Sequence, residues 1–459
     1  MNENTVAFSG KAFYHAIRIT LWWQWLLILV SLIAYGWLAY FIPRTATFEL
    51  LLCYGVLYLA YLALYRDTDS KQVYLFLGLA VVFRLVWFAA IPALSDDFYR
   101  FIWDGKLMAH GLNPFTATPE QLMQAGNLDH YNLTIELYQN LNSPRYFTIY
   151  PPLNQVVFWL AAELFPRSAW GSVMVMRFFI LLAELGSLLL LPRLLKLNQL
   201  PSKYALLYAL NPLVIAELTG NLHFEAMMIF FLLLAIYFWQ KQKVFTSGVM
   251  LGFSVAAKLL PLMLLPLWLG RLSWKKLLLF YLATGITCFL LFSYLLDADF
   301  LRGMQSSLGL YFSKFEFNAS IYYLIRQVGF WIKGYNIIEM VGKYLALSVV
   351  LFIAFMCLWQ HYRQLSIWQA MLWVWFFYLL MATIVHPWYL APLLVISVFT
   401  RFRFVVLWSF LIFFTYINYQ ADGYKENLWV VALEYVAVLV FLFYELVGKR
   451  KIKVSERLS

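Results

Sequence analysis

Two adjacent carboxylates at the edge of an apolar segment are the residues of this chain most suited to chemistry. Asp96 and Asp97 open the stretch Ser95–Phe115, SDDFYRFIWDGKLMAHGLNPF, directly after a hydrophobic run. Neighbouring side chains point in different directions, so we expect one carboxylate to act as a base and the other to bind a second group. A carboxylate near apolar walls has a raised pKa and can accept a hydroxyl proton. The alternative interpretation is a solvated helix end.

The same stretch carries a cation, an indole and a further acid. If it is helical, Asp97, Arg100 and Asp104 lie near one face, because residues three and four apart stack on a helix. Trp103 suits the headgroup level of an interfacial helix, and that position is also compatible with a substrate contact. We therefore treat Arg100, Trp103 and Asp104 as candidate substrate-binding residues. The turn at Gly111 to Pro114 ends the segment.

The loop that begins at Ser95 runs to Tyr150, far beyond the usual connection of about 4–6 residues. Loops of this length are commonly functional. It closes at Tyr150, Pro151 and Pro152, a pattern typical of a rigid helix start, since proline is tolerated in a first turn. The Tyr150 ring is also a surface on which a sugar can stack, so Tyr150 is a further candidate contact.

The composition places these residues in a membrane protein. The chain has 459 residues, of which 63% are hydrophobic and 12% charged, whereas a soluble protein has about 25% charged residues. Its net charge of +11 does not indicate nucleic-acid binding, because the basic residues sit in short loops and in the tail 448–459, as cytoplasmic retention favours. The three cysteines fall in apolar segments without disulfide or metal-ligand spacing. We expect a single integral membrane domain over residues 1–459.

The apolar runs predict an all-α polytopic bundle of about 12 transmembrane helices. The expected spans are 21–41, 47–65, 73–94, 172–191, 204–220, 224–239, 277–296, 338–358, 366–385, 387–400, 403–418 and 428–447.

Two further segments decide the topology. If 151–165 crosses the membrane, the basic loops that follow it lie outside, whereas an interfacial or re-entrant helix keeps them inside, as the positive-inside rule favours. The same reasoning makes 246–270, which contains Lys258 and two prolines, a broken or re-entrant pair. We therefore expect both termini in the cytoplasm. The loop 95–150 then faces the periplasm or exterior of a plasma (inner) membrane.

This topology brings polar segments to one outer face and so predicts an outward-facing site. They are 95–150, 221–225, roughly 297–337, and 386–389. His223, Glu225 and His386 are candidate hydrogen-bonding or phosphate-facing residues. We expect no cofactor: two histidines without further ligands do not make a zinc site, and the sequence does not support a divalent metal. Arg302 and Arg326 have no topological reason to be outside and are candidates to hold a phosphate, with plain surface charge as the alternative.

Charged residues inside the apolar spans need partners. Arg84 and Glu184 each lie near the middle of a span, where an isolated charge is disfavoured. We expect them to interact, as a buried stabilising pair or in a catalytic role. Lys258, beside the expected break, is suited to an anionic headgroup or to snorkelling.

The motifs of the first outer loop resemble those of a known group of membrane enzymes. Ser95–Gly105, His110–Phe115 and the Tyr150–Leu153 element are similar to the GT-C glycosyltransferases that use polyprenyl-phosphate sugars, above all the polyprenol-phosphomannose-dependent mannosyltransferases. The resemblance implies a polytopic enzyme with an essential Asp in this loop. Asp97, which precedes Tyr99 by two positions, matches that Asp, and Asp96 is the next choice. In the group the loop usually follows the first span, whereas here it follows the third.

The resemblance also implies a reaction. A sugar, mannose by this analogy, passes from a polyprenyl-phosphate donor to a glycan or glycolipid acceptor on the outer face, with inversion and with Asp97 as general base. The lipid bilayer is the expected environment. A flippase or transporter of lipid-linked oligosaccharide is the alternative, but it would place its charges along a central path. A non-catalytic assembly factor is a third possibility. No nucleotide-binding motif is present in the sequence.

Overall fold

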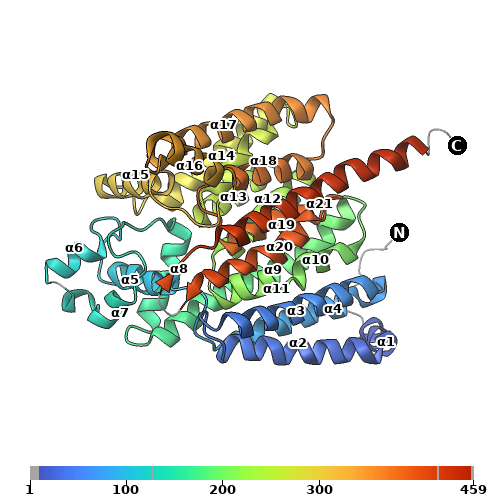
Figure 1. Cartoon of the computed structure of the whole chain (residues 1–459), viewed down its shortest axis with the longest axis horizontal. Helices are drawn as coiled ribbons and strands as arrows, with labels where there is room; N and C mark the ends of the chain where they lie inside the picture. The colour runs from blue at the N-terminus through green and yellow to red at the C-terminus, as the bar shows by residue number, and fades with distance from the viewer. Residues whose placement is uncertain (1–9, 127, 421–422, 456–459) are drawn as a thin grey trace.

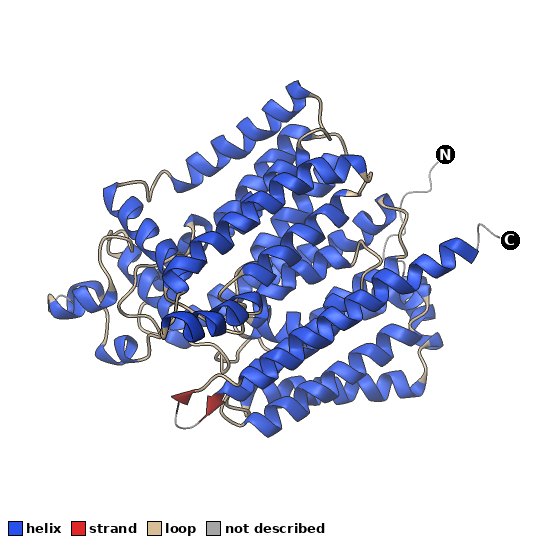
Figure 2. Ribbon diagram, turned by 45° about the horizontal axis from the view of Figure 1, so that its top comes forward, coloured by secondary structure: helices blue, strands red, loops and turns tan. Residues whose placement is uncertain are grey.

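The computed structural model describes residues 10–126, 128–420 and 423–455. Helices make up most of this part of the chain, and one short hairpin, β1 (Tyr419–Gln420) with β2 (Gly423–Tyr424), adds a pair of strands (Figures 1 and 2). The expected all-α class is confirmed. The N-terminal helices are α1 (Gly10–Ile19), α2 (Trp22–Tyr40), α3 (Thr47–Asp67), the 3-10 turn η1 (Ser70–Gln72) and α4 (Val73–Leu85).

The third expected span is shorter than the apolar run suggests. A continuous helix over 73–94 was expected, but α4 ends at Leu85 and turns lead on to Leu94. Pro92 has no amide proton for a helical hydrogen bond. Arg177 donates to the freed carbonyl oxygens of Phe88 and Ala90, so the irregular backbone is satisfied within the protein, as a membrane requires.

The long loop 95–150 is built of short helices. They are α5 (Asp97–Ala109), α6 (Pro119–Gln124), η2 (Asp129–Tyr131) and α7 (Ile135–Gln139), and α8 (Pro152–Leu164) follows. At 13 residues, α8 is about 20 Å long, less than the hydrocarbon core of about 30 Å. This length agrees with a 151–165 segment that does not cross.

Close packing joins α5 to α8. A side chain at Gly105 would place its Cβ 2.2 Å from the carbonyl oxygen of Phe158, so only glycine allows the two backbones to approach this closely. The helix α5 ends where expected, with Gly111 at a φ of 75°.

The middle of the chain contains broken helices. After α9 (Ala169–Leu197), the expected span 204–220 is divided into η3 (Ser202–Ala205), α10 (Leu206–Ala209), α11 (Pro212–Val214) and the π-helical turn η4 (Ile215–Gly220). Pro212 disfavours helical backbone at the residue before it. The following helix, α12 (Glu225–Gln240), is bent by 113° from the segment 212–220.

The expected break in 246–270 is present. α13 (Val244–Ala257) stops before Lys258, whose backbone is extended, and the 3-10 helix η5 (Leu260–Trp268) follows. The Asn154 amide donates to the carbonyl oxygen of Ala257 at 2.9 Å and so satisfies one acceptor at the broken end.

The C-terminal half contains long helices and interrupted ones. The long helices are α14 (Trp274–Phe292), α17 (Ile338–Tyr362) and α21 (Leu428–Ser455), and the expected loop 297–337 contains α15 (Ala298–Ser313) and α16 (Ile321–Lys333). The expected spans 366–385, 387–400 and 403–418 are shorter or divided. They appear as α18 (Ile367–Met381), η6 (Pro387–Tyr389), α19 (Leu390–Ser397), α20 (Phe404–Leu411) and η7 (Ile412–Asn418).

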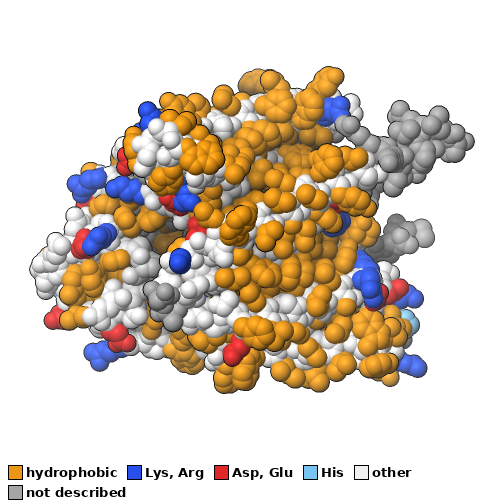
Figure 3. All heavy atoms as spheres, in the orientation of Figure 1, with side chains coloured by type: hydrophobic (Ala, Val, Ile, Leu, Met, Phe, Trp, Pro, Cys, Tyr) orange, Lys and Arg blue, Asp and Glu red, His pale blue; other side chains and the backbone are white. Residues whose placement is uncertain are grey.

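Fewer helices than expected can cross a bilayer as single straight elements. Among the described residues, six are long and apolar enough, and the bent pair around residue 222 would add a seventh. The expected number of about 12 is therefore not confirmed. Figure 3 shows hydrophobic side chains over the middle of the visible face, with charged groups gathered toward its two ends, so the protein is a membrane protein.

Loops that the charge pattern assigned to one face do lie together. Lys203 donates to the carbonyl oxygen of Arg66 at 2.8 Å, and Asn198 donates to Gln240 at 3.2 Å. In Figure 1, α1 and the C-terminal end of α21 lie at the end of the molecule opposite α5, α6 and α7. The loops between spans are therefore sorted into two ends.

The expected pairing of Arg84 with Glu184 is confirmed. An Arg84 guanidinium nitrogen lies 2.7 Å from Glu184 Oε2, and both side chains are fully buried. Arg84 also donates to the carbonyl oxygen of Ala209 at 2.7 Å, and the Tyr208 hydroxyl donates to Glu184 at 2.6 Å. The pair therefore fastens α4 and α9 to the broken segment 202–220.

Removal of either partner should destabilise the fold strongly. Arg84→Met or Glu184→Gln would leave a buried charge unpaired, at a cost of about 3–5 kcal/mol. The double change should cost less than the sum of the single ones. Thermal melting in detergent measures this coupling, with the exposed pair Arg66 and Asp67 as a control that should show almost none. Additive effects for the buried pair would contradict the prediction.

Candidate active site

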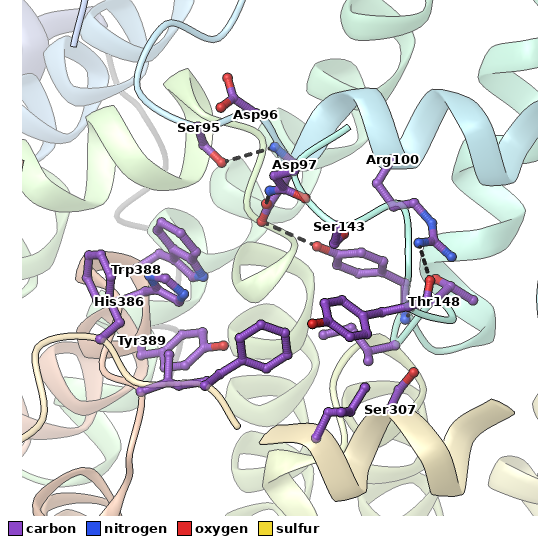
Figure 4. Close-up of a pocket in the computed structure, with 18 of the residues that line it drawn as sticks. Ser95, Asp96, Asp97, Arg100, Ser143, Thr148, Ser307, His386, Trp388 and Tyr389 are labelled. Atoms are coloured by element: carbon purple, nitrogen blue, oxygen red, sulfur yellow. Dashed lines mark hydrogen bonds between the residues drawn. The ribbon is translucent and has the colours of Figure 1, made fainter. Parts of the chain in front are cut away.

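A cavity of about 460 Å³ opens where the long loop 95–150 meets the break after α13 and the C-terminal segments (Figure 4). Residues from both halves of the chain line it. They are Arg44, 94–97, Arg100, 142–143, 146–150, Lys258, Ser307, Leu310, 315–317, Ile384, His386, Trp388, Tyr389, Tyr419 and Tyr424. Three of the four polar segments expected on one face contribute lining residues. The fourth, 221–225, lies directly behind the lining: His223 contacts Trp388, and Glu225 contacts Lys258.

The two adjacent acids have different partners. Asp96 forms an ion pair with Arg44 at 2.6 Å. Asp97 accepts hydrogen bonds from the Asn142 amide at 2.8 Å and from the Tyr150 hydroxyl at 3.3 Å, and within the described residues it has no ion-pair partner. Figure 4 shows the two carboxylates pointing apart. Asp97 is therefore held by neutral groups, whereas the charge of Asp96 is paired with that of Arg44.

Partial burial raises the basicity of Asp97. Desolvation raises the pKa of its carboxyl above the ordinary value, while hydrogen bonds from Asn142 and Tyr150 and the charge of Lys258 oppose that rise. A carboxylate with a raised pKa is a stronger proton acceptor than a solvated one.

Lys258 brings a cation to the same cavity. Its ammonium lies 3.0 Å from Glu225 Oε1, behind the wall, and within 5.5 and 6.0 Å of the ring centres of Tyr150 and Tyr389. The Glu225 side chain is 1% exposed, and that of Lys258 is 16% exposed. An ammonium carries three N–H donors, so Lys258 can pair with Glu225 and still donate into the cavity. Tyr150 contacts both Lys258 and Asp97.

The indole of Trp388 lies between the imidazole rings of His223 and His386 at one side of the cavity. The Trp388 ring stacks on His223 at 3.6 Å and on His386 at 4.3 Å between ring centres. Burial lowers the pKa of His386 to about 3, and the nearby Lys258 adds to this effect. His386 is therefore neutral at physiological pH and offers a hydrogen bond rather than a positive charge.

The remaining candidates of α5 brace the loop. Arg100 pairs with Asp104 at 2.7 Å and donates to the carbonyl oxygen of Tyr146 at 2.8 Å, and Gln155 donates to the second oxygen of Asp104. Arg100 lines the cavity, but Asp104 and Trp103 are fully buried and lie outside its lining. Arg100 and Asp104, four residues apart, lie on one face of α5, as their spacing predicts.

The candidate cations of 297–337 do not line the cavity. Arg302 is exposed and pairs with Asp299 in its own helix, next to a separate groove along α15 and α17. Arg326 pairs with Glu316, and that carboxylate, rather than the guanidinium, lines the cavity. Their expected phosphate contacts remain predictions without support from this arrangement.

Several lining residues were not singled out from the sequence. Arg44 carried a signal that could have been used, because it is a cation between two spans on the face where the positive-inside rule predicts few. Asn142 and the rings of Tyr419 and Tyr424 match no short motif, and only the folded chain brings them to Asp97. In the described part of the chain, no group of three or more His, Cys, Asp or Glu side chains is arranged to hold a metal ion.

The fold and the cavity have the parts of a membrane-embedded glycosyltransferase: apolar helices, an acid held by neutral groups, a cation and aromatic rings. Over residues 22–272 the chain matches the MptA_B family, described as alpha-(1->6)-mannopyranosyltransferase, N-terminal domain. The chain belongs to this GT-C-type mannosyltransferase family, and the protein is a glycosyltransferase, as the motifs of the first loop suggested. Neither the curated proteins nor the solved structures contain a match.

Substitution of the two acids should have unequal effects. Asp97→Asn should lower kcat/KM for sugar transfer by about 100-fold or more, since a general base contributes at least this much. Asp96→Asn should cost far less, because a partly exposed ion pair contributes only about 0–1 kcal/mol. Transfer rates of the two variants, compared at equal melting temperature, measure the difference. Equal losses would contradict the assignment of Asp97.

The pH profile should respond to Tyr150. Its hydrogen bond favours the ionised form of Asp97, so Tyr150→Phe should raise the pKa of that carboxyl further. A base must be ionised to act, and the acidic limb of kcat/KM should therefore move to higher pH. Tyr146→Phe, which changes another cavity tyrosine, is the matched control and should leave the limb in place. An unmoved limb in Tyr150→Phe would show that Asp97 does not govern it.

Proposed function

We propose that the protein transfers mannose from a polyprenyl-phosphate donor to a hydroxyl of a glycan or glycolipid acceptor, in an α-(1→6) linkage, on the outer face of a plasma (inner) membrane. Family membership makes the protein a mannosyltransferase. The observation that carries the proposal is the cavity that combines Asp97, held by neutral groups, with the cation Lys258. The whole chain acts as one domain, because residues from both halves line this cavity.

The reaction is an inverting displacement. Asp97 accepts the proton of the acceptor hydroxyl as its oxygen attacks C1 of the mannose. The bond between C1 and the phosphate oxygen breaks, and polyprenyl phosphate leaves with the electron pair. No nucleotide takes part, in keeping with the lack of a nucleotide-binding motif in the sequence.

Negative charge grows on the phosphate as it leaves, and a cation placed there stabilises the transition state. Lys258 is the best-placed candidate, because Glu225 engages it from behind while its ammonium reaches the cavity. The neutral His386 adds a hydrogen-bonding ring nitrogen on the same side. This assignment moves the expected phosphate contact from Arg302 and Arg326 to Lys258.

The orientation in the membrane follows from charge. The basic loops that contact one another lie at the end opposite the cavity, and the terminal helices lie with them. Because cytoplasmic loops carry the excess of Lys and Arg, we place that end in the cytoplasm and the cavity outside.

A transfer assay tests the donor. Purified protein in nanodiscs should transfer labelled mannose from polyprenyl-phosphate mannose to an α-mannoside and should not use GDP-mannose. Transfer from GDP-mannose alone, or from neither donor to any α-mannoside, would overturn the proposal.

The same assay tests Lys258. Lys258→Gln should raise the donor KM or lower kcat by about tenfold or more, as loss of a charge-assisted contact would. It also leaves Glu225 unpaired, so the double variant Lys258→Gln/Glu225→Gln removes both charges. If Lys258 holds the phosphate, the double variant stays impaired although its stability recovers. Recovered activity would limit Lys258 to pairing with Glu225. Arg302→Gln is the matched cation control and should behave like wild type.

A further inference from the structure

Three aromatic rings with no role in the steps proposed above form one wall of the cavity. We call Phe317, Tyr419 and Tyr424 the aromatic wall. The Tyr424 ring stacks on Phe317 with centres 5.6 Å apart and meets Tyr419 edge-on at 5.2 Å. All three line the cavity. The rings therefore present one continuous apolar surface to its interior.

Backbone contacts hold this wall in place. The Phe317 amide donates to the carbonyl oxygen of Thr383 at 3.0 Å, and the Val385 amide donates back to Phe317 at 2.8 Å. The Asn318 amide donates to Glu426 at 2.6 Å, which ties the segment to the hairpin region. Three segments distant in sequence are thus joined, so the wall is a built surface rather than a loose loop.

The wall begins beside the acids and opens to solvent. The Arg44 guanidinium lies 4.9 Å from the Tyr419 ring centre and pairs with Asp96, the neighbour of Asp97. Tyr424, in the middle of the wall, is 44% exposed. Tyr424 therefore lines the same cavity as Asp97 and is also open to solvent.

The wall lies outside the part of the chain that matches the family. The match ends at residue 272 and includes Asp97 and Lys258. Phe317, Tyr419 and Tyr424 come from the remaining part. Asp97 and Lys258, assigned to proton transfer and to the phosphate, thus belong to the matched region, whereas the aromatic wall and His386 come from the rest of the chain.

We propose that the aromatic wall is the acceptor subsite, in which a pyranose of the acceptor glycan packs its C–H face on Tyr424 and presents a hydroxyl to Asp97. The proposal rests on the role proposed above for Asp97 as base. Aromatic rings supply a large, rigid apolar contact, which suits the C–H face of a sugar. The donor carries a lipid chain that must remain in the bilayer, whereas an acceptor glycan reaches the cavity from water. A lining ring that is exposed to solvent favours the second substrate.

A binding measurement without donor tests the subsite. The probe is methyl α-D-mannopyranosyl-(1→6)-α-D-mannopyranoside, titrated against the full chain in nanodiscs and followed by saturation-transfer NMR. Tyr424→Ala should raise the Kd by about tenfold, as truncation of an aromatic anchor does. Tyr424→Phe keeps the ring and should bind close to wild type. Tyr335→Ala is the matched control, since Tyr335 is exposed and lies outside the cavity lining.

Kinetics separate the subsite from the donor site. Tyr424→Ala should raise the KM for the acceptor more than the KM for polyprenyl-phosphate mannose. An unchanged Kd, a wild-type protein that does not bind the probe, or an equal rise in both KM values would each overturn the acceptor subsite. If the wild type binds the probe in a Tyr424-dependent way but transfers nothing from polyprenyl-phosphate mannose, the proposed donor is wrong and the subsite stands.

Discussion

The fold around the cavity depends on one arginine that holds two irregular stretches of backbone. Arg177 of α9 donates to the carbonyl oxygens of Phe88 and Ala90 after α4, and to those of Thr219 and Gly220 at the end of η4. Backbone polar groups within a bilayer must be satisfied inside the protein. Because one fully buried guanidinium serves four acceptors, two helices can end side by side at this depth.

These ends are what create room for a site. A continuous α-helix uses its backbone polar groups internally and turns its side chains outward, whereas an interrupted one exposes residues at the break. Lys258 stands at one interruption and His223 at another, and α5 begins at Asp97, shortly after a third. Asn154 satisfies a carbonyl at the first of these breaks, as Arg177 does elsewhere. Buried polar residues such as Asn154 and Arg177 therefore satisfy backbone carbonyls at the helix breaks. These breaks in turn leave room for the cavity.

The sequence predicted the charges better than the helix ends. The Arg84–Glu184 pair followed from the cost of an isolated charge in lipid. The break at Lys258 followed from the positive-inside rule, applied to a segment with two prolines. The divided segment 202–220 was missed because an apolar window does not distinguish a continuous span from one interrupted at Pro212. The partners of Arg177 are backbone groups more than 40 residues away, and no spacing rule reveals them. Arg302 is a different case, because its partner Asp299 lies three residues away in the same helix, a spacing that is visible in the sequence.

The adjacent acids show how an environment divides two identical groups. Both begin as ordinary carboxylates, one residue apart, and the backbone turns them in different directions. Arg44, from the loop after α2, neutralises Asp96 and at the same time lies over Tyr419. Asp97 is left with an amide and a phenol, which orient its carboxylate without adding a full positive charge. A cation in direct contact would lower the basicity of Asp97. Arg44 instead pairs with Asp96, which is not proposed as the base, and packs on the ring of Tyr419.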